Sequence, residues 1–223
     1  MEIKNNEYNF LRKRLKRLEE VYKQSCDLIV RNAVKETTLY DIEEGIPGFY
    51  DTYAEKFEEC KMESLKEVLD LTDEILGNYT IEKLPKIEVK EAKKIFKVKE
   101  RALNAFVKAY NAAVEKENLS YFSQRVDDKL LLLTYEEGEF LGAVASVQRN
   151  RKNKEALCPF CKQFRRGEDI VFMTTNVKEA KSEYAVVGQY CCSEYENCNR
   201  DIEEIESVKK FIRYSYPKNK NKK

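Results

Sequence analysis

The stretch Cys158-Pro159-Phe160-Cys161, together with Cys192 and Cys198 further along, decides the fold of the second half of this chain. Two close cysteine pairs separated by a strand-sized insert suit one tetrahedral zinc ion, with each thiolate about 2.3 Å from the metal. Four thiolates leave no open coordination position for a substrate. The pattern therefore predicts a structural Zn²⁺ site with Cys158, Cys161, Cys192 and Cys198 as its ligands.

The elements expected around these cysteines are those of a treble-clef-like zinc finger. The first pair is expected in a turn that enters a strand region. The second pair is expected to run from the end of a strand, Tyr184–Cys191, into the start of the final helix, Arg200–Tyr214, where free N–H groups face the thiolates. Adjacent side chains of a strand point to opposite faces, so only one of Cys191 and Cys192 is expected to bind, and we choose Cys192. The other cysteines are expected to pack without a metal: Cys26, Cys60 and Cys191.

The composition predicts a globular, charge-rich protein. The chain has 223 residues, of which 42% are hydrophobic and 36% are charged, which is enough for one large or two small domains. No apolar run approaches the roughly 18 residues needed to cross a bilayer, and the first residues lack the apolar segment of a secretory signal. We therefore expect a cytoplasmic protein with no membrane partner, in which reduced cysteines indicate metal binding.

Histidine is absent from the sequence. Its absence excludes Ser-His-Asp and Cys-His nucleophiles, HExxH zinc hydrolases and histidine proton shuttles. Glycine-rich phosphate-binding loops of the two common types are also missing. The acidic residues spread along helical stretches, which is typical of solvated faces. We therefore expect no catalytic residues and no small-molecule substrate.

The charge distribution divides the chain between residues 83 and 84. Residues 1–83 carry 13 Lys and Arg against 19 Asp and Glu, a net charge of −6, whereas residues 84–223 carry 28 against 21, or +7. The first part contains four amphipathic stretches separated by tight turns, which predicts an antiparallel helical bundle. Its helices are expected at about 7–24, 27–44, 50–57 and 64–75.

The second part mixes helices with strands. Leu84-Pro85-Lys86 marks the junction, because proline cannot continue a helix. The expected elements are helices at about 89–98 and 101–117, a β-hairpin of Lys129–Tyr135 and Phe140–Val147, and a strand at Ile170–Thr174. We therefore predict an α+β fold, with a helical-bundle domain at 1–83 and an α/β zinc-finger domain at 84–223.

Several short motifs of this chain occur in the same order in one known protein family. They are Tyr8-Asn9-Phe10-Leu11-Arg12, Val21-Tyr22-Lys23, Leu84-Pro85, Ile95-Phe96, Leu119-Ser120-Tyr121-Phe122, Cys158-x2-Cys161, Val171-Phe172-Met173 and Gly188-x-Tyr190-x-Cys192-x5-Cys198-Asn199. In these motifs the chain resembles the FusB-type elongation factor G-binding proteins, the fusidic acid resistance family, some of whose relatives are labelled fibronectin-binding proteins. The cysteine block is the most specific part of the resemblance.

The resemblance implies a function as well as a fold. Members of the family bind elongation factor G, a translational GTPase, largely through the zinc-finger domain. They promote its release from the ribosome, including complexes stalled by fusidic acid. Such release needs a shift in conformational populations and no covalent chemistry. The resemblance also places Cys158, Cys161, Cys192 and Cys198 in the zinc-ligand positions.

A partner-binding surface beside the finger is implied too. Tyr190 matches an aromatic position of that surface, and tyrosine is a common hot-spot residue; a tyrosine that only packs beside the finger is the alternative. Leu157 and Val187 stand where the resistance proteins have an aromatic and a basic residue, respectively, which leaves drug resistance by this chain open. Phe160, between the first two ligands, completes the expected partner-binding set.

A second hypothesis is a zinc-finger module that binds RNA or the ribosome without contacting elongation factor G. It is based on the charge of +7 in residues 84–223 and on Phe160, Phe164 and Tyr190, whose rings can stack on bases. RNA binding that weakens steeply with salt would favour this hypothesis. An extracellular fibronectin adhesin fits poorly, because the chain lacks a secretion signal and has reducible thiols.

Overall fold

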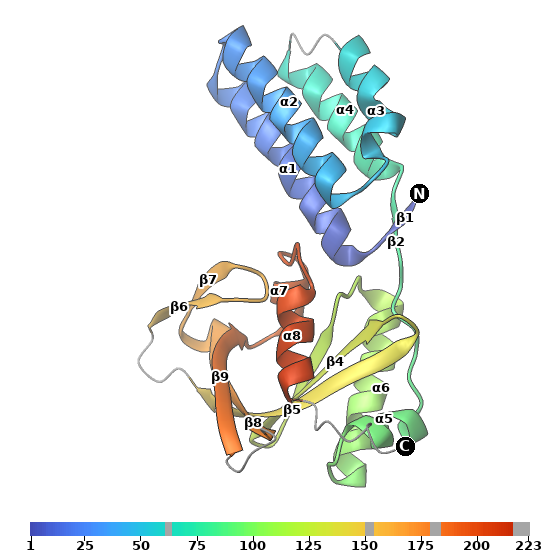
Figure 1. Ribbon diagram of the computed structural model, residues 1–223, viewed down its shortest axis with the longest axis vertical. Helices are drawn as coiled ribbons and strands as arrows, with labels where there is room; N and C mark the ends of the chain where they lie inside the picture. Colours follow the sequence, from blue (N-terminus) through green and yellow to red (C-terminus); the bar gives the residue numbers. More distant parts are fainter. Residues whose placement is uncertain (61–63, 150–153, 179–183, 216–223) are drawn as a thin grey trace. The chain divides into compact units, whose positions relative to one another are not determined.

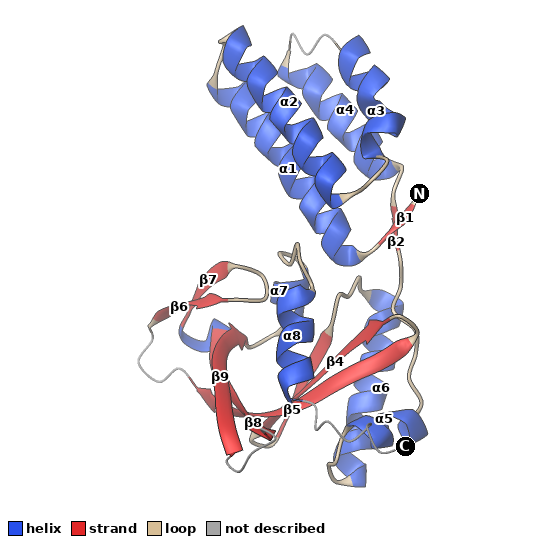
Figure 2. Ribbon diagram, viewed as in Figure 1, coloured by secondary structure: helices blue, strands red, loops and turns tan. Residues whose placement is uncertain are grey.

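The computed structural model describes residues 1–60, 64–149, 154–178 and 184–215. The chain divides into two compact units, Met1–Glu82 and Lys83–Lys223. The first unit is helical, whereas the second is built on a β-sheet with helices packed against it (Figures 1 and 2). This confirms the predicted α+β class. Within the described residues, no helix combines the length and the apolar character needed to cross a membrane.

Four helices and two short strands form the described part of the first unit. They are β1 (Glu2–Ile3), α1 (Asn5–Gln24), α2 (Leu28–Gly45), α3 (Phe49–Glu59), α4 (Leu65–Gly77) and β2 (Thr80–Ile81). Helix α1 packs on α2 and α4, and α2 packs on α3. The parallel pairing of β1 with β2 ties the first residues of the unit to its last ones.

The core of this unit follows from the spacing of its apolar residues. Leu11, Leu15 and Leu18 of α1 lie on one helix face and are fully buried.

Glu43 stabilises the turn between α2 and α3. Its carboxylate accepts hydrogen bonds from the backbone N–H groups of Gly48 (3.0 Å) and Tyr50 (2.7 Å). These two N–H groups lower the pKa of Glu43. Gly48 has φ +85°, a left-handed conformation that glycine adopts without steric cost.

The second unit contains a five-stranded antiparallel sheet, a two-stranded hairpin and four helices, together with one short 3-10 helix, in its described part. The elements are α5 (Val89–Ile95), α6 (Glu100–Lys116), β3 (Phe122–Val126), β4 (Lys129–Glu136), β5 (Glu139–Arg149), β6 (Glu155–Cys158), β7 (Gln163–Arg166), η1 (Gly167–Asp169), β8 (Ile170–Lys178), β9 (Tyr184–Cys192), α7 (Tyr195–Asn199) and α8 (Glu206–Ser215). The strand order in the sheet is β3-β4-β5-β8-β9, and β6 pairs with β7 separately.

Both faces of the sheet are covered, which explains the unbroken leucine run of β4. Leu130 and Leu132 belong to a core shared with α8 and the cysteine-rich hairpin. Leu131 and Leu133 belong to a different core, shared with α5 and α6. Since successive side chains of a strand alternate between faces, a strand buried on both sides must be apolar at every position.

Two helix predictions need correction. The helix expected at about 89–98 ends at Ile95, and the final helix begins at Glu206 rather than at Arg200. The carbonyl of Cys198 accepts hydrogen bonds from the N–H groups of Asp201 (3.0 Å) and Ile202 (2.9 Å), which close the last turn of the short helix α7. The fully buried Ile202 follows in a non-helical segment before α8.

Candidate metal centre

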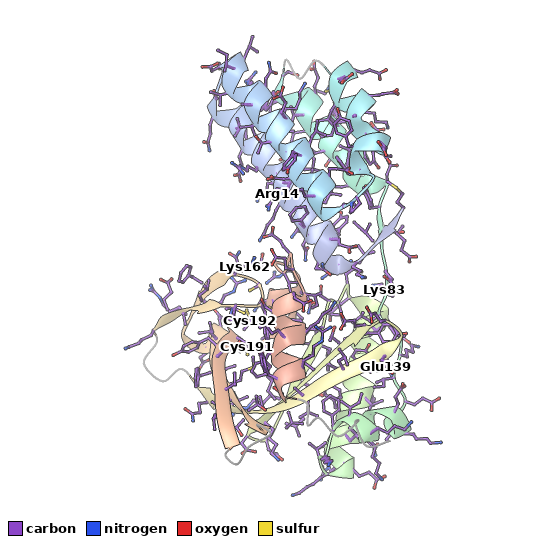
Figure 3. The ribbon with its side chains drawn as sticks, in the orientation of Figure 1. Arg14, Lys83, Glu139, Lys162, Cys191 and Cys192 are labelled. Carbon is purple, nitrogen blue, oxygen red and sulfur yellow. The ribbon has the colours of Figure 1, made fainter. Side chains whose placement is uncertain are left out.

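The first cysteine pair lies on the β6–β7 hairpin. Cys158 is the last residue of β6, and Cys161 lies in the turn that leads to β7. The N–H of Lys162 donates to the carbonyl of Cys158 at 2.8 Å and closes this turn. Lys162 has φ +55°, which brings the chain back sharply enough for both thiols to face the same side. Its position at the turn can be followed in Figure 3.

The second pair comes from β9 and α7. Cys192 is the last residue of β9, and Cys198 lies in α7, which follows after a short connection. The sequence prediction placed this pair between a strand and the final helix, whereas the structure gives Cys198 a short helix of its own. The order of hairpin turn, strand end and helix nevertheless matches the treble-clef-like arrangement predicted.

The structure brings the four predicted ligands together. Their Sγ atoms all lie within 4.8 Å of one another, and all four residues are buried. Cys158 and Cys198 are 3.9 Å apart and Cys161 and Cys192 are 3.6 Å apart, measured between Sγ atoms. A tetrahedral zinc ion with sulfur atoms at about 2.3 Å requires Sγ–Sγ separations of about 3.8 Å. The donor set and its spacing therefore fit zinc.

Cys191 is excluded from the cluster, although it is also buried. It pairs with Val171 in the β8–β9 ladder, and its side chain packs in the apolar core. Burial raises the pKa of the Cys191 thiol well above its ordinary value. In contrast, the thiol of Cys192 lies in the cluster, 3.6 Å from the Sγ atom of Cys161. The two adjacent cysteines of β9, both labelled in Figure 3, thus have different environments, as strand alternation predicts.

One cation lies against the cluster. Arg165 of β7 forms an ion pair with Asp201 at 2.5 Å. Burial disfavours its charge, but the nearby Cys192 sulfur and the paired Asp201 carboxylate outweigh burial and raise the pKa of Arg165. A divalent ion held by four thiolates carries a net negative charge, which this guanidinium offsets. Sequence reasoning missed Arg165, because its approach to Cys192 depends on the folded hairpin.

Asn199, which directly follows the last cysteine, is a second residue near the cluster whose role was not predicted from the sequence. It is only 4% exposed. Its Oδ1 accepts hydrogen bonds from the backbone N–H groups of Ser120 (2.6 Å) and Tyr121 (3.3 Å), and its Nδ2 donates to the carbonyls of Tyr121 (2.8 Å) and Tyr195 (3.0 Å). Asn199 thereby fastens the cysteine-bearing helix to the chain just before β3. The only signal in the sequence was its place at the end of the cysteine motif.

The predicted partner-binding residues are not all at the surface. Leu157 is 45% exposed and pairs across the hairpin with Phe164, which is 64% exposed. Tyr190 is half-buried and packs edge-on against Phe172, with ring centroids 5.1 Å apart. Val187 is also half-buried, but it lies three residues from Tyr190 in a regular strand and therefore points to the opposite face.

Phe160 does not reach the surface at all. It is 1% exposed and packs between Tyr121 and Phe211, with ring centroids 5.6 and 6.2 Å away. The ring therefore packs in the core beneath the cysteine turn, where neither a protein partner nor a nucleic-acid base can contact it. The expectation that Phe160 contributes to a binding surface is wrong for this reason.

Comparison with known proteins gives one informative result. No family model matches the chain, and no curated protein matches it by sequence. Among solved structures, the fusidic acid resistance protein FusC is similar, with a TM-score of 0.66 at 16% sequence identity, over 96% of this chain and 97% of that one. At this identity the likeness shows the fold alone. The chain therefore has the fold of a fusidic acid resistance protein over nearly its whole length, as its sequence motifs predicted.

Proposed function

We propose that this protein binds elongation factor G and promotes its release from the ribosome, without catalysing a reaction itself. The observation that carries the proposal is the coincidence of two independent likenesses. The sequence motifs resemble the elongation factor G-binding family, and the fold is similar to that of FusC over 96% of the chain. The ribosome is then an indirect partner, met through elongation factor G in the cytoplasm.

The four-cysteine cluster supports the proposal by supplying a rigid platform. We propose that Cys158, Cys161, Cys192 and Cys198 hold a structural Zn²⁺ ion. In that role the ion fixes the β6–β7 hairpin and α7 relative to β9. A preorganised surface binds a partner at a lower entropic cost than a mobile one.

The contact surface we propose lies on the outer face of this hairpin and on β9. Leu157 and Phe164 form an exposed apolar pair next to the cysteines, and Tyr190 lies two residues before a ligand. Exposed apolar side chains that cluster in this way often mark protein–protein contacts. Val187 belongs to the proposed surface only at its margin, because it takes the other face of β9.

Titration calorimetry of the zinc-loaded protein against elongation factor G from the same organism tests the proposal. We expect one-to-one binding at micromolar or tighter affinity. Leu157→Ala combined with Phe164→Ala is expected to weaken it about tenfold or more, because these side chains contribute little to the core. Ile29→Ala, on α2, removes an apolar side chain that is 80% exposed and serves as the control. Absence of binding by the wild-type protein at physiological salt would refute the proposal.

Tyr190→Ala is the natural third variant, but it also removes the ring contact with Phe172. Its thermal unfolding must therefore be compared with that of the wild type. Tyr190→Phe keeps the ring and removes only the hydroxyl. Equal affinity for Tyr190→Phe and reduced affinity for Tyr190→Ala would assign the contact to the ring.

A further inference from the structure

Helix α5 presents a stripe of lysines to solvent. Lys90, Lys93 and Lys94 are exposed, whereas Ala92 and Phe96 on the opposite side are buried. The spacing of these lysines, three and four residues apart, places them on one face of a helix. Three positive charges therefore point outward from a single turn and a half of α5.

The neighbouring segment enlarges this stripe into a surface. Lys97 and Lys99 lie in the connection between α5 and α6, and Arg101 and Lys108 lie on α6; all four are exposed. We define these seven cations as the α5–α6 basic surface: Lys90, Lys93, Lys94, Lys97, Lys99, Arg101 and Lys108. Three acidic residues occur in the same range, Glu88, Glu91 and Glu100, so that segment 88–108 has a net charge of +4.

Packing and hydrogen bonds fix α5, which carries the first three of these cations, to the rest of the second unit. Gly142 of β5 lies directly under α5, because a Cβ atom at this position would come within 2.6 Å of Ile95 and 2.7 Å of Phe96. The side chain of Asn111 on α6 bonds both the N–H and the carbonyl of Ile87, each at 3.0 Å, and fixes the start of α5. The seven charges therefore stand on a packed scaffold.

Ion pairs do not neutralise these charges in the described part of the chain. The cations of the cysteine hairpin are paired there: Lys162 with Glu204, Arg165 with Asp201, and Arg166 with Glu155. None of the seven surface cations forms an ion pair with another described residue. Among the described residues, the positive charges of α5 and α6 are therefore not compensated by ion pairs, whereas those of the cysteine hairpin are.

We propose that the α5–α6 basic surface binds RNA through its phosphate backbone. Lysine is depleted at the centres of protein–protein interfaces, whereas lysine contacts to phosphate dominate nucleic-acid binding that does not read the base sequence. The segment carries no exposed aromatic ring for base stacking, which favours backbone contacts. The choice of RNA over other polyanions rests on the proposed function at the ribosome.

The surface leaves the metal centre free for a protein partner. Helices α5 and α6 cover the face of the sheet that carries Leu131 and Leu133, and the cysteine cluster belongs to the core on the face of Leu130 and Leu132. Elongation factor G and RNA would therefore meet opposite faces of one sheet. Simultaneous binding of both is expected.

Fluorescence anisotropy with a labelled RNA duplex of about 20 base pairs tests the surface directly. If about three to five phosphates are contacted, log K should fall against log [salt] with a slope of about −2.7 to −4.5. The variant Lys90→Gln/Lys93→Gln/Lys94→Gln is expected to lose about tenfold or more in affinity and to flatten the slope by up to about 2.7. Glutamine is a good helix former, so α5 should stay intact.

The matched control is Lys66→Gln/Lys129→Gln/Lys210→Gln. It removes the same charge from three exposed lysines outside the surface. RNA affinity within twofold of the wild type for this control, with a tenfold loss for the α5 variant, supports the assignment. Equal losses in both variants would show general attraction by net charge and overturn it. Absence of RNA binding by the wild type, or polyglutamate competing as well as RNA, would overturn it too.

The calorimetric titration against elongation factor G is independent of this test. Because the α5 lysines lie on the other face of the sheet, the α5 variant should bind elongation factor G within twofold of the wild type. Binding of RNA without binding of elongation factor G would refute the proposed function and leave the basic surface standing. The reverse result would refute only the basic surface.

Discussion

Asn199 forms a two-way bond with the backbone of Tyr121: its Oδ1 accepts from the Tyr121 N–H at 3.3 Å, and its Nδ2 donates to the Tyr121 carbonyl at 2.8 Å. The side-chain amide of Asn199 thus makes the same pair of hydrogen bonds with Tyr121 that the backbone of a neighbouring strand would make. The contact joins the helix that bears the last cysteine to the chain at the edge of the five-stranded sheet. The metal centre and the sheet are thereby parts of one structure.

Replacing Asn199 by Ala should therefore destabilise the second unit. The change leaves the buried N–H and carbonyl of Tyr121 without these partners, and we expect a loss of about 2–4 kcal/mol. Urea unfolding followed by tyrosine fluorescence measures it. Asn197→Ala, at a half-buried position of α7 whose side-chain oxygen accepts from the Arg200 guanidinium, is the control and should change stability by less than about 0.5 kcal/mol. A loss for Asn199→Ala no larger than the control would contradict this role.

Removal of a ligand should release the metal. Cys158→Ser or Cys198→Ser is expected to reduce zinc from one ion per chain to far less, and to unfold the second unit, since metal binding contributes on the order of 10 kcal/mol. The helical unit should stay folded. Cys26→Ser changes an exposed cysteine and should keep the full metal content. The measurements are elemental analysis and circular dichroism; a helical unit that melts together with the finger would argue against independent folding.

Arg165 should strengthen metal binding without touching the metal. Arg165→Met removes the positive charge beside Cys192, and we expect zinc affinity to fall by about 10- to 100-fold. Competition with a chromophoric chelator gives this affinity. Arg166→Met, next along β7, is the matched control, because the Arg166 side chain is 66% exposed and pairs only loosely with Glu155 at 3.8 Å. Equal affinities for the two variants would show that the charge of Arg165 is irrelevant.

Glu136 should stabilise the packing of α8 in a pH-dependent way. It pairs with Lys209 at 2.8 Å and with Arg213 at 2.5 Å, and these cations lower the pKa of Glu136. The stabilisation is therefore fully present above the ordinary glutamate pKa of about 4.3 and is lost as the pH falls through the lower pKa of the folded state.

The corresponding variant is Glu136→Gln. We expect a loss of about 0.5–1 kcal/mol at pH 7 after solvent screening, which shrinks as the pH falls below the ordinary glutamate pKa. Unfolding by urea at several pH values measures the difference between the two proteins. Glu139→Gln is the control, because Glu139, across the turn, is exposed and forms no ion pair with another described residue. A difference that stays constant down to pH 3 would mean that the ion pairs are not its source.

Much of this architecture is readable in the sequence, because local patterns determine it. The leucine run of β4 predicts a strand, and the leucine spacing in α1 predicts a helix face; the structure has both. The cysteine spacing likewise predicts a four-thiol cluster, because a zinc knuckle has few variants. The helix face and the strand depend on residues close together in the chain, and the cluster is readable because each cysteine pair has a characteristic local spacing, although the two pairs lie far apart.

The features that sequence reasoning missed depend on distant contacts. Phe160 is buried because Tyr121 and Phe211 enclose it, and each lies about 40 or more residues away. The final helix was predicted to start too early, because the apolar spacing from Ile202 to Ile212 begins before α8, in the non-helical segment between α7 and α8. Periodicity shows which side chains face the core and does not show where a helix begins.

The bond between Asn199 and Tyr121 also has a consequence for solubility. Strand β3 is an edge of the five-stranded sheet, and an uncovered edge can recruit a strand from another molecule. Asn199 occupies backbone groups of Ser120 and Tyr121, just before β3, as long as α7 stays in place. If the proposed Zn²⁺ ion holds α7, its loss would free this stretch of the edge to pair with another chain.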